Sequence, residues 1–195
     1  MAATRIALAQ IDTRVGDLDG NARKVLDQAR HAAEAGADVV VLGEMTLAGY
    51  PIEDLALRGS FQRAAAERAT RLATELDAAG LGGLAVVVGT LGTVGGPHPG
   101  STAPRPSNRA LVLRGGRVEA SYDKRHLPNY GVFDEFRIFA PGSTTTVFEA
   151  AGRRFGLVVC EDVWVDGPVS ELAGVDAILV LNGSPFEAGK SAVRR

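Results

Sequence analysis

Residues 38–44, DVVVLGE, decide the fold class of this chain. Four consecutive apolar residues are followed at once by a glycine and a carboxylate. A near-continuous run of Val and Leu is typical of a strand that is buried on both faces, as in parallel sheets. Glu44 therefore stands at the carboxyl end of a buried strand, where α/β sheets place their ligand sites. The alternative interpretation of Glu44 is a solvated loop carboxylate.

Similar apolar runs recur along the chain and alternate with helical patterns. Strands are predicted over residues 5–11, 38–42, 84–91, 109–113, 155–160 and 176–181. One helix is predicted over residues 21–35, with Gly36 as its stop, and a second begins at Ser60 as N-cap and runs to about Ala79. The alternation of strands and helices predicts an α/β domain.

Two connections have distinctive compositions. Residues 92–107, GTVGGPHPGSTAPRPS, are so rich in Gly and Pro that we expect a mobile loop between two strands. Residues 114–117, RGGR, predict a hairpin turn that leads into a strand over residues 118–122. No internal repeat is evident.

Composition restricts the class of protein. The chain has 195 residues, 46% hydrophobic and 23% charged, which suits one domain with a real core or most of a larger one. The formal net charge of -2 argues against a nucleic-acid partner. The apolar runs are shorter than the roughly 20 residues of a membrane span, and the N-terminus reads as a strand rather than a signal peptide. A single cysteine excludes an internal disulfide, so the cytoplasm is the simplest location.

Two further residues with chemical potential follow predicted strands. Lys124 comes directly after VEASYD, and Cys160 ends the run FGLVVC. Most lysines are surface charges, and a lone cysteine is often a small buried hydrophobe, so each residue alone has an ordinary explanation. A nucleophile at the end of a strand is exposed at the sheet edge, however, and the next backbone N–H can face a developing oxyanion.

A functional site is predicted more strongly by three residues together, Glu44, Lys124 and Cys160, than by any one of them alone. All three stand at carboxyl ends of predicted strands, and a parallel-type sheet would bring them to one edge. A thiolate needs a base or a nearby cation to form at neutral pH. Glu44 could take the thiol proton, and Lys124 could stabilise the thiolate and the tetrahedral intermediate. The three histidines are poorly placed for this work: His31 in a helix, His98 in the Gly/Pro-rich loop and His126 two residues after Lys124.

The order Glu–Lys–Cys, within GEM…GYP, DKRHLPNYGVFDEF and VVCEDVW, resembles the nitrilase superfamily. The stretch KRHLPNYGVFDEFR…FAPG, with YPIEDLALR before it, is similar more narrowly to the glutaminase domains of glutamine-dependent NAD synthetases. The resemblance covers nearly the whole chain. It implies a four-layer α-β-β-α sandwich, usually paired with a second copy.

The resemblance also implies roles for individual residues. Glu44 would be the general base, Lys124 would stabilise the intermediate, and Cys160 would form a γ-glutamyl thioester. Contacts to L-glutamine are implied for Tyr130, Ser184 and Lys190, and a place in the pocket wall is implied for Tyr50, Phe133, Glu135, Glu161 and Trp164. Glu135 would hold either Lys124 or the substrate amine.

Two departures from the family pattern affect the domain assignment. Family glutaminase domains continue past residue 195, so we expect residues 1–195 to be an incomplete domain, poorly active by itself. The synthetase half, which would use ATP and Mg²⁺ to amidate nicotinic acid adenine dinucleotide, has no counterpart in this sequence. The family's Asn-Ala-Ser after the last strand is Asn182-Gly183-Ser184 here, which keeps the serine.

Other functions are less well supported by the sequence. A phosphate-binding loop ending at Gly189-Lys190-Ser191 lacks the required earlier glycine, because Ser184 stands there. The GLGGLA of residues 80–85 precedes a strand instead of following one, unlike a dinucleotide-binding loop. No His/Cys spacing predicts a metal, and no cofactor is expected for this region. A nitrilase-type amidohydrolase for other small amides or carbamoyl compounds, or an inactive fragment of such a domain, remains an alternative.

Overall fold

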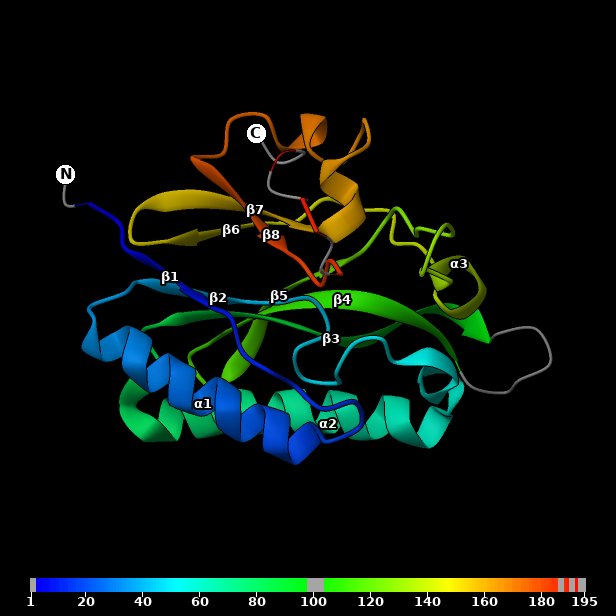
Figure 1. Ribbon diagram of the computed structural model, residues 1–195. Coiled ribbons are helices and arrows are strands. Elements are labelled where there is room, and N and C mark those ends of the chain that lie inside the picture. Colours follow the sequence, from blue (N-terminus) through cyan, green and yellow to red (C-terminus); the bar gives the residue numbers. More distant parts are fainter. Residues whose placement is uncertain (1–2, 98–103, 186–187, 190–191, 193–195) are drawn as a thin grey trace.

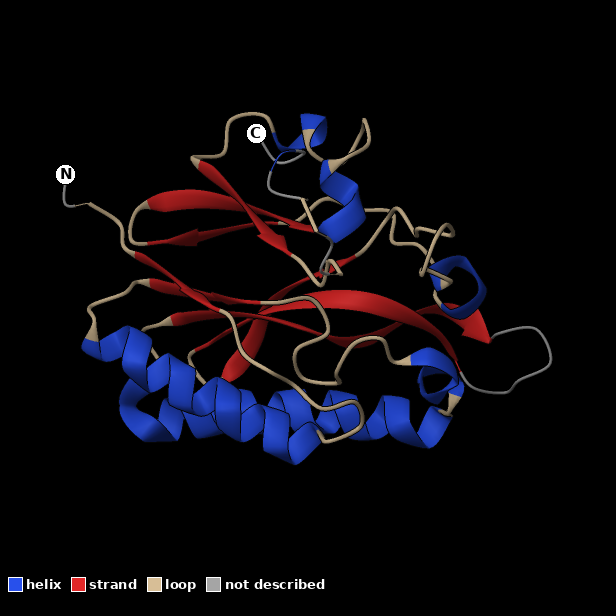
Figure 2. Ribbon diagram, in the orientation of Figure 1, coloured by secondary structure: helices blue, strands red, loops and turns tan. Residues whose placement is uncertain are grey.

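The computed structural model describes residues 3–97, 104–185, 188–189 and 192 of the chain. Two β-sheets lie face to face, and two long helices cover the outer face of the larger sheet (Figures 1 and 2). The helices are α1, Leu18–Glu34, and α2, Gly59–Leu76. Short helical segments are η1 (Glu53–Leu57), η2 (Asp77–Leu81), α3 (Glu135–Ile138), η3 (Cys160–Val163) and η4 (Ser170–Leu172).

The larger sheet has the strand order β1-β2-β3-β4-β5. Its strands are β1 (Ile6–Ala9), β2 (Val39–Leu42), β3 (Ala85–Pro97), β4 (Pro104–Arg114) and β5 (Arg117–Asp123). β1, β2 and β3 run parallel, and β4 is antiparallel to both β3 and β5. β5 therefore runs in the same direction as β2, and the carboxyl ends of these two strands lie at the same edge of the sheet.

The smaller sheet has the order β6-β7-β8, with β6 at Val147–Ala150, β7 at Arg153–Val159 and β8 at Ala177–Leu181. β6 and β7 are antiparallel, while β7 and β8 are parallel. On the outer face of this sheet, the side chain of Leu172 in η4 packs over Gly156, where an added Cβ would approach it to 2.7 Å. The glycine thus lets η4 lie close to the sheet.

Side chains that point alternately to the two faces of the larger sheet produce two apolar layers. One face of the larger sheet packs against α1 and α2 through residues such as Val40, Val86 and Leu72. Its other face, with Val41, Val87 and Val112, packs against the smaller sheet. The predicted near-continuous apolar strand at residues 38–42 is therefore buried on both sides, as its sequence indicates.

The prediction of a loop over residues 92–107 is wrong at both ends. β3 extends to Pro97 and β4 begins at Pro104, and the two strands pair from Gly92↔Ser107 to Pro97↔Pro104. The antiparallel partner supplies backbone hydrogen bonds that composition cannot foresee, and this pairing overrides the low strand propensity of Gly and Pro. Residues 98–103, including His98, lie outside the described residues.

The boundaries of the second helix also differ from expectation. α2 begins at Gly59 with Arg58 as N-cap, and the backbone N–H groups of Phe61 and Gln62 donate to the Arg58 carbonyl. Ser60 is therefore inside the first turn, because η1 leads the chain directly into the helix. The α-helix ends at Leu76 and continues as the π-helical turn η2. The hairpin at residues 114–117 is confirmed.

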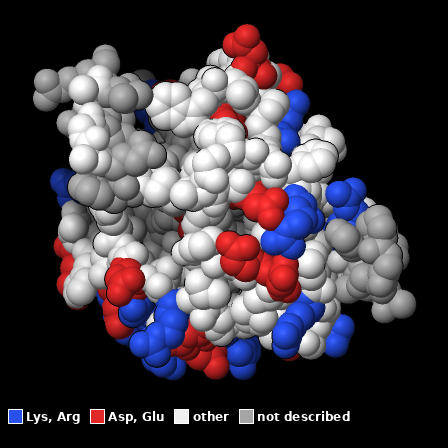
Figure 3. Space-filling view, turned by 45° about the vertical axis from the view of Figure 1, so that its right-hand side comes forward, with Lys and Arg blue, Asp and Glu red and all other residues white. Residues whose placement is uncertain are grey.

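The surface carries charges of both signs. On the face shown in Figure 3, acidic and basic side chains lie intermixed, consistent with the net charge of -2. Among the described residues, no helix has the length and hydropathy needed to cross a membrane.

Candidate active site

The turn after β2 places Glu44 between the two sheets. Its backbone N–H donates to the carbonyl of Asn182, which follows β8, at 3.3 Å. The carboxylate accepts from the Gly183 N–H at Oε2 (2.8 Å) and from Asn108 Nδ2 at Oε1 (2.7 Å). The side chain is 1% exposed. Glu44 is thus a buried carboxylate held by donors from both sheets.

Lys124 follows β5 and points into the same buried space. Its Nζ lies 2.8 Å from Glu44 Oε1 and 2.7 Å from Glu135 Oε2, and the side chain is 1% exposed. Burial alone would lower the pKa of Lys124, but the two carboxylates outweigh it, so its pKa is raised and the ammonium is retained. The surface-charge interpretation of Lys124 is wrong.

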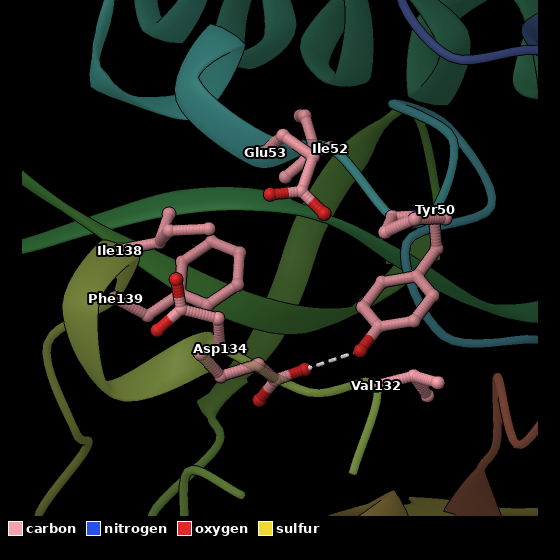
Figure 4. A pocket seen from close by; sticks show the side chains of 9 residues that line it. Tyr50, Ile52, Glu53, Val132, Asp134, Ile138 and Phe139 are labelled. Carbon is pink, nitrogen blue, oxygen red and sulfur yellow. Dashed lines mark hydrogen bonds between the residues drawn. The ribbon is translucent and has the colours of Figure 1, made fainter. Parts of the chain in front are cut away.

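Glu135 begins α3 and completes the buried ion cluster. Burial raises its pKa, as does the nearby Glu44 charge, while Lys124 and the Tyr50 hydroxyl act in the opposite direction. Tyr50 donates to Glu135 Oε1 at 3.0 Å, the bond drawn in Figure 4. Tyr50, Val132, Asp134, Ile138 and Phe139 surround a cavity of about 20 Å³ beside this bond (Figure 4). Burial and the Glu135 charge raise the pKa of Tyr50, so its hydroxyl stays neutral and remains a hydrogen-bond donor.

Cys160 occupies a sharp turn between β7 and η3. Its φ of 44° lies in the left-handed region, which a residue with a Cβ adopts only when its surroundings impose it. Its Sγ is 3.9 Å from Ser184 Oγ, and the residue is 5% exposed. Burial and the Glu44 charge raise the thiol pKa to about 11, while Lys124, the Gly183 N–H and Ser184 act to lower it.

The thiol is therefore protonated at neutral pH in the resting site. Many nucleophilic cysteines are activated by a lowered pKa instead. Here the neighbouring carboxylate that opposes a thiolate is also a potential acceptor for its proton. The arrangement fits proton removal during the attack of the sulfur, which is general base catalysis, better than a permanent thiolate.

The remaining sequence-predicted residues lie on the outer parts of the site. Tyr130 donates to Glu161 Oε2 at 2.8 Å and meets the Phe133 ring edge-on, with centroids 5.7 Å apart. Trp164 is 62% exposed and helps to line a concavity of about 270 Å³ formed by residues between Val163 and Ser170. Lys190 lies outside the described residues.

Three residues in or next to the site were not singled out by the sequence analysis. Asn108 bridges Glu44 and Glu135 through Nδ2, at 2.7 and 3.4 Å. Gly183 contributes only its backbone N–H, and Asp162 accepts four hydrogen bonds just beyond Cys160. The available sequence signal for Asn108 was a polar residue shortly before the apolar run ALVL. The Gly/Pro-rich stretch directly before Asn108 obscured this signal.

The expectation of one parallel-type sheet is also corrected. Glu44 and Lys124 come from the larger sheet, whereas Cys160 and Ser184 come from the smaller one. The residues meet because the strand ends of two facing sheets converge. Among the described residues, no group of three His, Cys, Asp or Glu is arranged to hold a metal ion.

Comparison with known proteins places the fold in a family. The family described as Carbon-nitrogen hydrolase matches residues 5–193. The chain belongs to the carbon-nitrogen hydrolase family.

This carbon-nitrogen hydrolase chain is similar to longer proteins. It is 41% identical over 197 residues to a glutamine-dependent NAD(+) synthetase of Xylella fastidiosa, and 37% identical over 192 residues to that of Acinetobacter baylyi. Each comparison covers 97% of this chain and 33% of the relative. The chain thus spans about a third of the length of these relatives.

Solved structures agree with the expected nitrilase-like fold and confirm it. A glutamine-dependent NAD+ synthetase from Acinetobacter baumannii superimposes with a TM-score of 0.84 at 35% identity, covering 100% of this chain and 35% of that one. A nitrilase-superfamily amidase from Nesterenkonia gives a TM-score of 0.76 at 28% identity, covering 97% and 69%. The solved structures that this chain resembles therefore include an amidase as well as a synthetase.

Proposed function

We propose that this carbon-nitrogen hydrolase region hydrolyses the side-chain amide of L-glutamine and supplies the ammonia to a synthetase that forms NAD. The observation that carries the proposal is the convergence of Glu44, Lys124 and Cys160 in a chain that resembles glutamine-dependent NAD synthetases over 97% of its length.

In this proposal Cys160 Sγ attacks the amide carbon while its proton passes to Glu44. Lys124 Nζ stabilises the negative oxygen of the tetrahedral intermediate. The C–N bond then breaks, and Glu44 returns the proton to the departing nitrogen, which leaves as ammonia. Water attacks the resulting thioester, and Glu44 takes up one proton of the water. Cleavage of the C–S bond then releases glutamate, and Glu44 returns that proton to the departing sulfur, which regenerates the thiol.

Glutamine recognition involves the outer residues. Tyr130, Ser184 and Lys190 contact the substrate, and Tyr50, Phe133, Glu135, Glu161 and Trp164 contribute to the pocket. Ser184 is supported by its 3.9 Å distance from the sulfur, and Glu161 and Tyr130 by their mutual hydrogen bond at the exposed side. Glu135 acts on Lys124, since the two charges are 2.7 Å apart.

The intact protein joins this region to an ATP- and Mg²⁺-dependent synthetase region and assembles as a homo-oligomer in the cytoplasm. Support comes from relatives named as glutamine-dependent synthetases, of which this chain matches about a third. The assignment of residues 1–195 to one incomplete glutaminase domain stays a prediction.

The test is Cys160→Ala in the intact protein. Glutamine hydrolysis should fall by about 10⁴-fold or more, because no other group replaces the covalent step. NAD formation from added ammonia should survive in the same variant, since the synthetase chemistry does not use this sulfur. Thr70→Ala, which removes an exposed hydroxyl from α2, serves as the control and should retain both activities.

Two results would contradict the proposal. If Cys160→Ala retains glutaminase activity, Cys160 is not the nucleophile. If the wild type hydrolyses small aliphatic amides but does not hydrolyse glutamine, the alternative of a nitrilase-type amidase is favoured. That alternative has a structural relative in the Nesterenkonia amidase, whose active-site cysteine is modified by acrylamide in one structure.

A further inference from the structure

Asp162 is a completely buried carboxylate that the proposed reaction does not use. It stands two residues after Cys160, and its hydrogen-bond partners among the described residues lie outside the ion cluster of Glu44, Lys124 and Glu135. We propose that Asp162 is a positioning residue that fixes the Cys160 turn of the smaller sheet against the Lys124 segment of the larger one. The inference rests on the proposed function, since it concerns the same nucleophile.

The hydrogen bonds of Asp162 reach both sheets. Oδ2 accepts from the Tyr122 hydroxyl at 2.8 Å and from the Val159 N–H at 3.2 Å. Oδ1 accepts from the N–H groups of Arg125 at 3.2 Å and His126 at 2.9 Å. Tyr122 is two residues before Lys124, and Arg125 and His126 follow it directly. One carboxylate thus joins the end of β5 to the end of β7.

The backbone of Cys160 explains why such a connection is needed. The residue is held at φ 44°, a conformation that the surrounding contacts must maintain. The bond to Val159 N–H fixes the residue immediately before the turn, and Asp162 itself belongs to the η3 turn that begins at Cys160. The Asp162 carboxylate therefore holds the turn that carries the Cys160 sulfur, and the same carboxylate holds the backbone next to Lys124.

All four partners of Asp162 are hydrogen-bond donors, so the site requires an acceptor at both oxygens. A carboxylate provides this, whereas an asparagine would turn an NH₂ group toward two of the donors. Asp162→Asn therefore disturbs the connection while keeping the size of the side chain. Tyr122→Phe removes one donor and leaves the carboxylate in place.

The experiment measures both variants in the intact protein. The first readout is the pH profile of Cys160 alkylation by iodoacetamide, which needs neither glutamine nor turnover. The second is kcat and KM for glutamine, and the third is the thermal midpoint. Asp176→Asn is the matched control, because Asp176 accepts from the Arg154 N–H at 2.7 Å at the opposite end of the same sheet.

We expect Asp162→Asn to lower kcat by about 10- to 100-fold with a much smaller change in KM, since small displacements of reacting groups cost rate in this range. The alkylation profile should move to higher pH as the sulfur loses its relation to the Lys124 ammonium. Tyr122→Phe should show the same changes at smaller size. Asp176→Asn should leave kcat and the alkylation profile unchanged.

The proposal is overturned if kcat and the alkylation profile of the folded variants equal those of the wild type. If Asp162→Asn does not fold, the positioning role is judged from kcat and the alkylation profile of Tyr122→Phe. Absence of glutamine hydrolysis in the wild type would remove the proposed function, yet the comparison of alkylation profiles would still support or overturn the positioning role.

Discussion

At the scale of residues, the buried cluster places one cation between two carboxylates. Lys124 lies within 2.8 Å of Glu44 and 2.7 Å of Glu135, and all three side chains are buried. Ions removed from water are costly unless each is paired, so the lysine is needed to keep both acids in place. For the thiol next to them the compensation by Lys124 is only partial, so burial and the Glu44 charge raise its pKa.

The raised pKa of Cys160 predicts a pH dependence of reactivity. Alkylation by iodoacetamide should follow a midpoint near pH 11 rather than the ordinary 9.0, because burial and Glu44 oppose the thiolate. Lys124→Met should move the midpoint higher still, since the ammonium is the largest influence lowering it. Arg125→Met is the control, because Arg125 pairs with the more exposed Glu171. A midpoint at or below 9 would show that the resting site stabilises the thiolate.

The same shift predicts how stability changes with pH. The thiol holds its proton to about pH 11 in the folded state and to about 9.0 in the unfolded state. Its contribution is therefore complete below pH 9 and is lost as pH rises toward 11, by about 2–3 kcal/mol. Cys160→Ala should lack this loss in denaturant unfolding, and equal pH slopes for the two proteins would contradict the explanation.

At the scale of elements, the turn that carries Glu44 is pressed against β3. Gly89 of β3 has no room for a side chain, because an added Cβ would contact Met45 N and lie 2.6 Å from the Gly43 carbonyl. The Leu47 N–H also donates to the Gly89 carbonyl at 2.9 Å. A glycine in the middle of a strand thus sets the position of Glu44, the proposed general base.

Gly89→Ala should therefore reduce glutamine hydrolysis more than an ordinary strand substitution. The backbone atoms it meets cannot move without shifting Glu44, so we expect a loss of about 10²-fold in kcat together with reduced thermal stability. Gly83→Ala is the control, since an added Cβ there meets nothing within 4 Å. Full activity of Gly89→Ala would show that the turn tolerates displacement.

The elements that the sequence predicts correctly are those whose signal lies within one short stretch of the chain. The strand over residues 38–42 and the hairpin at 114–117 depend on local composition, and both are observed. The strands within residues 92–107 depend on each other as partners, which a reading of single segments misses. In the site, strand-end residues such as Lys124 were found from local pattern, whereas the importance of Asn108 and Asp162 depends mainly on contacts with residues far away in the sequence.

At the scale of the whole molecule, the first strand lies at the edge of the larger sheet. Within the described part of the chain β1 pairs with β2 alone, and on β1 Leu8 is 81% exposed while Ile6 is 36% exposed. An apolar strand at a sheet edge is a template for association with other chains. In the 195-residue chain by itself, this edge is the expected site of self-association.

Leu8→Lys should reduce that association, because a charge on an edge strand opposes pairing with a second edge. The measurement is the mass distribution by sedimentation across a concentration series of the 195-residue chain. Val132→Lys is the control, since Val132 is 79% exposed but lies outside the strands. Equal association of wild type and Leu8→Lys would assign the contact to another surface.

The bond between Glu44 and Gly183 joins positions 139 residues apart. During synthesis, β1 to β5 are translated before Cys160 and Gly183. An unfinished chain can contain Glu44 and Lys124 while it still lacks both the thiol and the Gly183 N–H that holds Glu44. Assembly of the proposed site therefore waits for β7, β8 and the residues after β8, and a nascent chain that stops before Gly183 would lack the proposed activity.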